Sequence, residues 1–460
     1  MASDSFSSLS ISSAQIANLD SLNYKVMTPV QAQGLPHVLQ GKDLIARAKT
    51  GSGKTATFGI GLLEQINPRF FGAQALILCP TRELADQVGK ELRKLARCIP
   101  NIKLVLLCGG KPFGFQKASL EHGAHIIVGT PGRIQDHLNR ETLVLDGLKT
   151  LVLDEADRML DMGFSEVINE IIELTPKTRQ TLLFSATYPE SIGQMCESIL
   201  REPITVSVES EHQTSVIDQA FYKVKEHQRN DTLLALFEHY QPETTVVFCH
   251  TKKQCDEVAR YLDGHNIEAL AIHGDLEQRD RDQVLVRFAN KSCSVLVATD
   301  VAARGLDIKS LSAVINFELP RDPDIYVHRI GRTGRAGEKG IALSLFIDSE
   351  KMRVNAIEEY QNKDCNIKAV DSLNRDDKFS VHPVMATMQI DVGRKNKIRP
   401  GDILGALTGD AGLQGSQIGK IDIFDVASYI AIERKALRKV LDYFANGKIK
   451  GRSVRARMIS

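Results

Sequence analysis

Short runs of apolar residues alternate with longer amphipathic runs over most of the chain. Six apolar runs lie before residue 207, at 44–46, 75–79, 104–108, 125–128, 150–153 and 181–184. Five more follow a polar stretch, at 245–249, 269–272, 294–298, 313–317 and 342–346. Apolar runs this short indicate buried strands, and the amphipathic runs between them, such as 81–95, indicate helices. Strands that alternate with helices predict parallel sheets with both faces covered.

The last 80 residues follow a different pattern. Residues 386–392 alternate in polarity, and residues 400–408 open with Pro-Gly-Asp, which is typical of a helix start. The remaining predicted elements are strands at 419–424 and 427–432, a helix at 435–444 and a strand at 453–459. This β-α-β-β-α-β order is the ferredoxin-like arrangement used by RNA-recognition modules.

Two polar stretches divide these patterns into domains. We predict an α/β domain at 1–207, a linker at 208–216, a second α/β domain at 217–370, a linker at 371–380 and a small α+β domain at 381–460. Two similar sheets joined by a short hinge would leave a cleft between them, which is a common place for a ligand.

Charge is unevenly distributed along the 460 residues. The net charge is +1, but residues 381–460 hold 14 Lys and Arg against 7 Asp and Glu, so this segment carries +7 and the rest −6. A basic segment on a mildly acidic body favours binding to a polyanion, although a solvated basic surface is the alternative. The eight cysteines form no Cys-x-x-Cys pair, which suits a reducing compartment and argues against zinc. With no apolar stretch of about 18 residues and no signal-like start, we expect a cytoplasmic protein without a membrane partner.

A glycine-rich segment follows the first predicted strand and opens a helix. It reads Ala48, Lys49, Thr50, Gly51, Ser52, Gly53, Lys54, Thr55. The spacing matches a phosphate-binding loop except that Ala48 replaces the first glycine. Lys54 would neutralise the terminal phosphates of a nucleotide and Thr55 would help to hold Mg²⁺. A capped glycine-rich turn is the structural alternative.

Two acids follow the apolar run 151–153. Asp154 could hold Mg²⁺, and Glu155 could orient and deprotonate a water molecule. Alone, the pair could equally be an acidic helix start. With the phosphate loop upstream, it favours hydrolysis of a phosphoanhydride. Far downstream, Arg332 and Arg335 lie on a glycine-punctuated segment, where arginines could stabilise charge on a transferred phosphoryl group; a solvated basic turn is the alternative.

Further short motifs occur in a fixed order: Tyr24 with Thr28-Pro29-Val30-Gln31, Pro80–Ala85, Gly109-Gly110, Thr130–Arg133, Ser185–Thr187, Val246–Thr251, Gln278 with Arg281, Ala298–Asp307 and His328–Arg335. In these motifs, which extend from Phe6 to about Ile347, the chain resembles the DEAD-box RNA helicases. The resemblance implies two tandem RecA-like parallel-sheet domains and an ATP substrate. It also implies a Q motif at 4–32, and nucleotide contacts from Phe6, Tyr24, Gln31 and Asp307.

The same resemblance implies roles for other residues. Arg332 and Arg335 would act as arginine fingers, and Asp157, Ser185 and Thr187 would couple hydrolysis to strand separation. The RNA backbone would be held by Pro80, Thr81, Arg82, Gly110, Thr130, Arg133, Thr251, Gln278, Arg281 and Thr299.

The basic C-terminal segment resembles the RNA-binding domain of DbpA-type helicases in residues 398–407 and 450–458. This resemblance implies an RRM-like domain that docks on a hairpin of large-subunit ribosomal RNA. Candidate RNA contacts are Arg394, Lys448, Lys450 and Arg452. The segment lacks the Lys/Arg-Gly-Phe-x-Phe pattern with which RNA-recognition modules stack bases. We therefore expect binding by basic surface and loop shape. Phe424 and Tyr429 are interpreted as core residues, with a platform for RNA bases as the alternative.

Together these observations predict an RNA-dependent ATPase that uses ATP and Mg²⁺ to separate RNA duplexes locally. Its expected partners are 23S ribosomal RNA and a pre-ribosomal particle during large-subunit assembly, and we expect a monomer. An ATP-dependent RNA clamp or ribonucleoprotein-remodelling scaffold with little strand separation remains an alternative. A DNA translocase is disfavoured by the Q motif, the Asp-Glu-Ala-Asp sequence and the RNA-type C-terminal segment.

Overall fold

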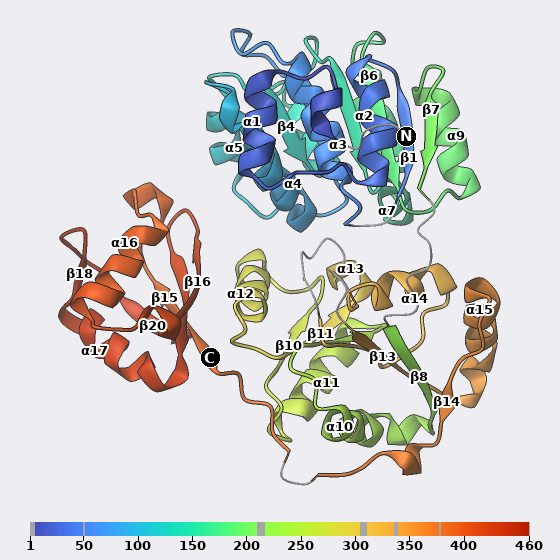
Figure 1. Cartoon of the computed structure of the whole chain (residues 1–460), viewed down its shortest axis with the longest axis vertical. Helices are drawn as coiled ribbons and strands as arrows, with labels where there is room; N and C mark the ends of the chain where they lie inside the picture. The colour runs from blue at the N-terminus through green and yellow to red at the C-terminus, as the bar shows by residue number, and fades with distance from the viewer. Residues whose placement is uncertain are drawn as a thin grey trace. The chain divides into compact units, whose positions relative to one another are not determined.

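The computed structural model describes residues 5–48, 51–208, 217–303, 311–334, 339–376 and 379–459 (Figure 1). The chain divides into two compact units on either side of the polar stretch at 208–216.

The first unit is a seven-stranded parallel sheet in the order β3-β4-β2-β5-β6-β1-β7. Its strands are β1 (Leu44–Arg47), β2 (Ala75–Leu78), β3 (Leu104–Leu107), β4 (Ile126–Gly129), β5 (Thr150–Asp154), β6 (Gln180–Ser185) and β7 (Ile204–Ser207). Its helices are α1 (Ser13–Ser21), α2 (Pro29–Leu39), α3 (Lys54–Gln65), α4 (Arg82–Leu95), α5 (Phe113–Leu120), α6 (Pro131–Asn139), α7 (Ala156–Asp161), α8 (Ser165–Glu173) and α9 (Glu190–Ile199). Successive strand residues enter two cores, so helices α1–α4 pack on one face and α6–α9 on the other.

The second unit begins with another seven-stranded parallel sheet, in the order β10-β11-β9-β12-β13-β8-β14. Its strands are β8 (Ile217–Lys223), β9 (Thr245–Cys249), β10 (Ala269–Ile272), β11 (Val295–Thr299), β12 (Ala313–Asn316), β13 (Gly340–Phe346) and β14 (Ile367–Lys368). Its helices are α10 (Arg229–Tyr240), α11 (Lys252–Asp263), α12 (Gln278–Ala289), α13 (Asp300–Ala303), α14 (Pro323–Ile330) and α15 (Lys351–Gln361). Helices α10 and α11 pack on one face of the sheet, and α14 and α15 on the other.

The second unit ends in a small α+β part, which we call the C-terminal domain (residues 385–459). Its four-stranded antiparallel sheet has the order β16-β17-β15-β20. The elements are β15 (Met385–Ile390), α16 (Pro400–Gly405), β16 (Ile418–Ile423), β17 (Ser428–Glu433), α17 (Leu437–Asn446) and β20 (Ala456–Ile459), with a separate hairpin of β18 (Lys448–Ile449) and β19 (Arg452–Ser453). Counted along the chain, the sheet order is 2-3-1-4, which is the ferredoxin-like order. The predicted fold class, two tandem RecA-like domains and a small α+β domain, is confirmed.

The structure adds strands that apolar runs did not reveal. Strand β7 is at a sheet edge and buries only one of its four residues well, and β14 is a two-residue edge strand. Edge strands lack the continuous apolar runs of central strands. The run predicted as one strand at 453–459 is shorter, because β19 ends at Ser453 and β20 begins at Ala456. Over the described ranges, no helix is long and apolar enough to cross a membrane.

Candidate nucleotide and RNA sites

The phosphate-loop segment turns sharply between β1 and α3. Gly51 has φ 86° and Gly53 has φ 97°, a left-handed conformation that glycine adopts without strain. A Cβ atom on Gly53 would lie 2.5 Å from Nε2 of Gln31, so this part of the loop also has no room for a side chain. The loop leads into the N-terminus of α3, where backbone N–H groups can receive an anion. Lys49 and Thr50 lie outside the described residues.

Lys54 is held across this loop. Its side chain is almost buried, and Nζ donates a hydrogen bond to the carbonyl oxygen of Ala48 at 3.0 Å. Ser52 and Thr55 are partly exposed beside it. The structure therefore places a positive charge and the N-terminus of a helix together at one turn, which is suited to phosphate binding.

Asp154 ends β5 with its carboxylate buried. It is 3% exposed, and its Oδ1 has no hydrogen-bond partner among the described residues. Burial raises the pKa of Asp154 to about 6; nearby Lys54 lowers it and Glu155 raises it further. A buried carboxylate oxygen without a partner is unusual and needs an explanation. An oxygen-binding cation such as Mg²⁺ would supply the missing partner, so this residue fits a metal ligand.

Glu155 is the next residue and has an uncommon backbone conformation. Its φ and ψ are 52° and 54°, in the left-handed region, and its side chain is 8% exposed. Such conformations are costly for residues other than glycine and cluster at functional sites. Glu155 also forms the N-terminal cap position of α7, so the acid pair spans the junction of β5 and that helix.

Asp157 is the second residue of α7 and contacts the loop after β6. Its Oδ2 accepts hydrogen bonds from the backbone N–H of Thr187 at 3.0 Å and from the Thr187 hydroxyl at 2.8 Å. Ser185 donates its hydroxyl to the carbonyl oxygen of Thr187 at 2.6 Å. Burial raises the pKa of Asp157, but the hydrogen bonds from Thr187, together with the nearby charges of Arg158 and Lys54, leave the pKa below its ordinary value. The structure thus brings the three predicted coupling residues together.

The Q motif is joined directly to the phosphate loop. Gln31 is buried; its Oε1 accepts from the N–H of Thr28 at 2.9 Å, and its Nε2 donates to the carbonyl of Gly53 at 3.2 Å. Phe6 is buried too and packs edge-on to Tyr24, with 6.3 Å between the ring centroids. The Tyr24 hydroxyl donates to Oε1 of Glu91 at 2.6 Å. A change at Gln31 would therefore also disturb the turn at Gly53.

The predicted RNA contacts of the first unit meet at one edge of its sheet. They lie in the loops that follow β2, β3 and β4, which are neighbouring strands. The Arg82 guanidinium, after β2, lies so close to Gly109 that a Cβ there would be 3.1 Å from Nη2. Arg133, after β4, donates from Nη1 to the carbonyl of Lys111 at 3.0 Å. The set that gathers here is Pro80, Thr81, Arg82, Gly110, Thr130 and Arg133.

The second unit repeats this arrangement. Thr251, the pair Gln278 and Arg281, and Thr299 follow β9, β10 and β11, which are also neighbours in their sheet. Arg281 donates from Nη1 to the carbonyl of His273 at 3.3 Å, and Thr299 ends β11 with 8% exposure. Each sheet therefore collects its predicted RNA contacts at the carboxyl ends of three adjacent strands, where open α/β sheets bind ligands.

The predicted contacts of the C-terminal domain lie on its surface. Lys448, Lys450 and Arg452 are exposed on the β18–β19 hairpin, which turns through Lys450 (φ 51°) and Gly451 (φ 75°). Lys450 donates to the carbonyl of Lys397 at 3.3 Å and pairs with Asp402 at 2.8 Å. These bonds bring the hairpin next to residues 394–397, and Arg394 itself donates to the carbonyl of Ile423 at 2.8 Å.

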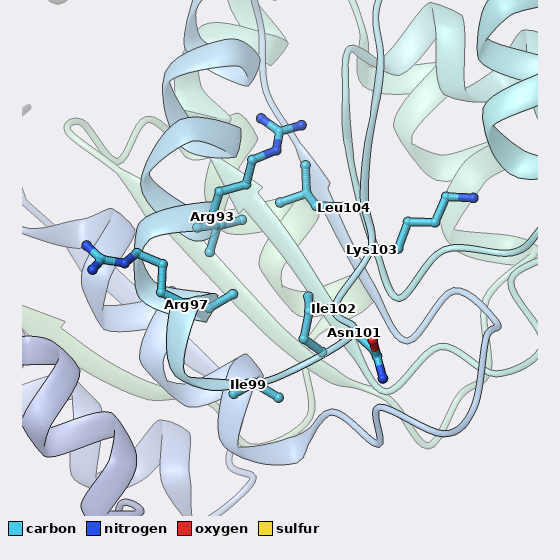
Figure 2. A pocket seen from close by; sticks show the side chains of 9 residues that line it. Arg93, Arg97, Ile99, Asn101, Ile102, Lys103 and Leu104 are labelled. Atoms are coloured by element: carbon cyan, nitrogen blue, oxygen red, sulfur yellow. The ribbon is translucent and has the colours of Figure 1, made fainter. Parts of the chain in front are cut away.

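A separate hollow of about 370 Å³ lies in the first unit (Figure 2). It is lined by Leu92, Arg93, Ala96, Arg97, Ile99, Asn101, Ile102, Lys103 and Leu104. These residues surround the C-terminal end of α4 and the start of β3, so the hollow lies at the amino end of the sheet. None of the residues predicted to bind nucleotide or RNA lines it.

Comparison with known proteins agrees with this arrangement. Residues 28–195 match the DEAD/DEAH box helicase family, residues 228–337 the helicase conserved C-terminal domain, and residues 387–458 the DbpA RNA binding domain. The chain is 52% identical over 446 residues to the ATP-dependent RNA helicase DbpA of Escherichia coli (strain K12), with 97% of each chain covered. The chain belongs to the DbpA-type DEAD-box RNA helicases.

Other relatives share the helicase part of this DbpA-type protein. The DEAD-box ATP-dependent RNA helicase CshA of Bacillus subtilis (strain 168) is 45% identical over 355 residues, which cover 77% of this chain and 72% of CshA. A solved structure of S. cerevisiae Dbp5 bound to RNA and ADP BeF3 is 31% identical, with a TM-score of 0.73, and covers 80% of this chain and 96% of Dbp5. The DbpA-type helicase described here is an RNA-dependent ATPase that binds ATP and RNA.

One residue that organises this DbpA-type helicase was not predicted. Arg329 is 2% exposed and makes a bidentate pair with Asp300, at 2.7 Å and 2.8 Å. Arg329 lies in the last turn of α14, three residues before Arg332, and Asp300 directly follows Thr299. The pair therefore connects the arginine segment to the loop that holds Thr299. The sequence shows an arginine at this position of the motif at 328–335, but it does not show that the side chain is buried.

Arg332 follows α14, is partly exposed, and donates its backbone N–H to the carbonyl of Arg329 at 3.1 Å. Arg335 and Asp307 lie outside the described residues. The predicted roles of these three residues at the nucleotide remain proposals.

Proposed function

We infer that this DbpA-type helicase hydrolyses ATP in response to a hairpin of 23S ribosomal RNA and separates nearby RNA duplexes during assembly of the large ribosomal subunit. The observation that supports this most is the match of residues 387–458 to the DbpA RNA binding domain. That domain carries an exposed basic hairpin, as expected for contacts to phosphates. The site of action would be a pre-ribosomal particle in the cytoplasm, and the free cysteines suit a reducing compartment.

The proposed ATP site is built on Lys54, Asp154 and Glu155. Lys54 would neutralise the phosphates at the N-terminus of α3, and Gln31 would recognise adenine. Mg²⁺, when bound by Thr55 and Asp154, would supply charge neutralisation at the phosphates. Glu155 would orient and deprotonate the attacking water. Arg332 and Arg335 would stabilise the negative charge that spreads over the transferred phosphoryl group.

The proposed RNA contacts divide into two classes. Residues at the carboxyl ends of the two parallel sheets would hold the sugar-phosphate backbone without reading sequence. Residues of the C-terminal domain, namely Arg394, Lys448, Lys450 and Arg452, would select the ribosomal hairpin. Selectivity would therefore depend on the C-terminal domain, and hydrolysis on the two sheets.

ATPase and duplex-separation assays with a panel of RNAs would test this proposal. We expect a 23S fragment that contains the recognised hairpin to stimulate hydrolysis at a lower concentration than unrelated hairpins of equal length. The double change Lys448→Glu and Arg452→Glu should remove this preference, whereas Arg438→Glu on the exposed side of α17 should keep it. Equal stimulation by every RNA would contradict the ribosomal target. ATP turnover without strand separation would favour the clamp or scaffold.

A further inference from the structure

One phenylalanine beside the predicted RNA contacts of the first unit is exposed. Phe115 lies in the first turn of α5, and its exposed fraction is 64%. Helix α5 follows β3, and the loop between them contains Gly109 and Gly110. Single exposed apolar side chains are common on protein surfaces, so exposure alone does not indicate a ligand contact. The surroundings of this ring decide whether it is suited to one.

The turn that carries Phe115 is held in place by its neighbours. Gln116 is 5% exposed and donates from Nε2 to the carbonyl of Cys108, the residue after β3, at 2.8 Å. Phe113 stacks on His137 of α6, with 4.2 Å between the ring centroids and 16° between the ring planes. Phe115 is therefore an exposed aromatic side chain on a fixed turn, and a preorganised group loses less conformational entropy when it binds.

The same turn is joined to a predicted RNA contact. Arg133, at the start of α6, donates from Nη1 to the carbonyl of Lys111 at 3.0 Å. The guanidinium of Arg140 lies 4.5 Å from the centroid of the Phe113 ring. The loop after β3 and helix α6 are thus connected at two places. The ring of Phe115 lies at the same edge of the sheet as Arg133, where the proposed RNA backbone contacts gather.

Charge around the ring favours a polyanion. Residues 109–120 contain two lysines and no acid, and both Lys111 and Lys117 are exposed. On α6, Arg133 and Arg140 share the carboxylate of Asp136, at 3.7 Å and 2.7 Å. Proteins that bind single-stranded nucleic acid combine such basic surfaces with aromatic side chains on which bases stack.

A protein partner fits this place less well. Protein interfaces are built around clusters of large apolar side chains. Over residues 72–143, all of which the structure describes, Phe115 is the only large apolar side chain that is exposed. One ring flanked by lysines matches a nucleotide better than an apolar protein surface.

We propose that Phe115 is a stacking platform for one RNA base, next to the loops that hold the RNA backbone in the first unit. The loops would hold phosphates and sugars, and the ring would take the face of a base from the same strand. Every base has an aromatic face, so the contact adds affinity without reading sequence. It favours a separated strand, because bases inside a duplex are already stacked on one another. The inference rests on the proposed RNA grip at this edge of the sheet.

A fluorescence experiment tests the stacking directly, because the chain contains no tryptophan. Full-length Phe115→Trp would be mixed with ADP, beryllium fluoride and a single-stranded RNA of non-ribosomal sequence. We expect the fluorescence of the new indole to be quenched as a base stacks on it, in parallel with binding measured by anisotropy. At saturation, an abasic strand of equal length should leave the fluorescence unchanged, since it offers phosphates and sugars only.

A matched control lies at the other edge of the same sheet. Phe70, in the loop before β2, is also exposed (48%), and Phe70→Trp should show no quenching by either strand. Binding of RNA to Phe115→Trp without quenching would overturn the proposal. Equal quenching by the abasic strand would overturn it too, because a base would not be required.

A replacement series tests whether the contact needs a ring. Phe115→Ala and Phe115→Leu should each weaken binding of this RNA about 5- to 100-fold, as loss of one aromatic–base stack does, and Phe115→Trp should retain it. Because the side chain is exposed, the melting temperature should stay nearly constant. Full affinity in Phe115→Leu would overturn stacking.

Arg133→Ala separates failure of this inference from failure of the proposed grip. It should also weaken RNA binding, through loss of a backbone contact. Weakened binding in Arg133→Ala with full affinity in Phe115→Ala would overturn the stacking platform alone. Full affinity in both variants would overturn the proposed grip at this edge as well.

Discussion

At the scale of single residues, the acid pair after β5 combines a buried charge with a strained backbone. Asp154 keeps one carboxylate oxygen without a partner, and Glu155 adopts a left-handed conformation. Both features cost folding free energy. Natural proteins tolerate such costs where function requires them, which is consistent with a metal ligand next to a catalytic base.

Asp154→Asn should stabilise the ligand-free protein while it abolishes ATP hydrolysis. A pKa displaced from 3.8 to about 6 corresponds to about 3 kcal/mol of unfavourable charge burial. Between these pH values the folded state binds a proton that the unfolded state has released, so stability falls as pH rises through this window. We expect a gain of about 1–3 kcal/mol for the first unit at pH 7.5 and no gain at pH 4 or below. Chemical denaturation at both pH values measures it, and Asp161→Asn on α7 is the exposed control.

Glu155→Gln should stop hydrolysis and keep ATP-dependent RNA clamping. The amide preserves the size of the side chain but cannot take a proton from water. We expect a fall in kcat of at least about 100-fold, as is typical for loss of a general base, with nucleotide binding nearly unchanged. Single-turnover hydrolysis and RNA dissociation with ATP present measure the two effects. Glu166→Gln on α8 is the matched control, and rapid turnover by Glu155→Gln would contradict the assignment.

At the scale of secondary-structure elements, a short helix in each unit connects two of the loops that carry predicted site residues. In the first unit α7 starts at the acid pair and joins the loop after β6 through Asp157 and Thr187. In the second unit α14 ends before Arg332 and joins the loop after β11 through Arg329 and Asp300. Because both connections are charge-assisted and partly buried, movement of one loop would carry the other with it.

Asp157→Asn should separate ATP hydrolysis from strand separation. The change weakens two hydrogen bonds to Thr187 and should cost about 1–3 kcal/mol of stability. The hydrogen bonds from Thr187, together with the nearby charges of Arg158 and Lys54, leave the pKa of Asp157 lowered in spite of burial, so its stabilising contribution is present at neutral pH and is lost as pH falls through the folded pKa.

We expect Asp157→Asn to retain a measurable RNA-stimulated ATPase and to separate fewer duplexes per ATP consumed. Parallel ATPase and unwinding assays give this ratio. Asp161→Asn lies on the same helix with an exposed side chain and should leave the ratio unchanged. An unchanged ratio in Asp157→Asn would show that this contact does not couple the two steps.

At the scale of the whole molecule, positive charge is concentrated in the C-terminal segment, which is the part proposed to select RNA. Residues 381–460 carry a net charge of +7 on a chain whose other residues carry −6. The hairpin residues Lys448 and Arg452 are exposed, so their charges are available to phosphates. Binding that releases counterions weakens as salt rises.

RNA affinity of the full-length protein should therefore depend strongly on salt. About four phosphate contacts from the C-terminal domain would give a slope of about −3 in a plot of log affinity against log salt concentration. Lys448→Ala with Arg452→Ala should reduce the magnitude of the slope by about 1.5. Fluorescence anisotropy at salt concentrations between about 50 and 200 mM measures both slopes. An unchanged slope in the double variant would place the phosphate contacts elsewhere.

Whether a strand could be predicted from the sequence also depended on its place in the whole molecule. The apolar runs at 245–249 and 269–272 coincide with β9 and β10, because central parallel strands are buried on both faces. Strand β8 was missed because polar residues interrupt its first half. The hairpin β18–β19 was missed because each strand has only two residues and its two central residues carry the turn.

The sequence by itself determined those features that depend on local spacing. The phosphate loop is an example, since glycines at 51 and 53 followed by Lys54 specify a turn and a helix start within a few residues. Only the tertiary structure decided which groups from distant segments meet: Gln31 against Gly53, Arg329 against Asp300, and Thr387 against Asn290. The physical reason is that burial and hydrogen bonding at these places depend on how separate elements pack.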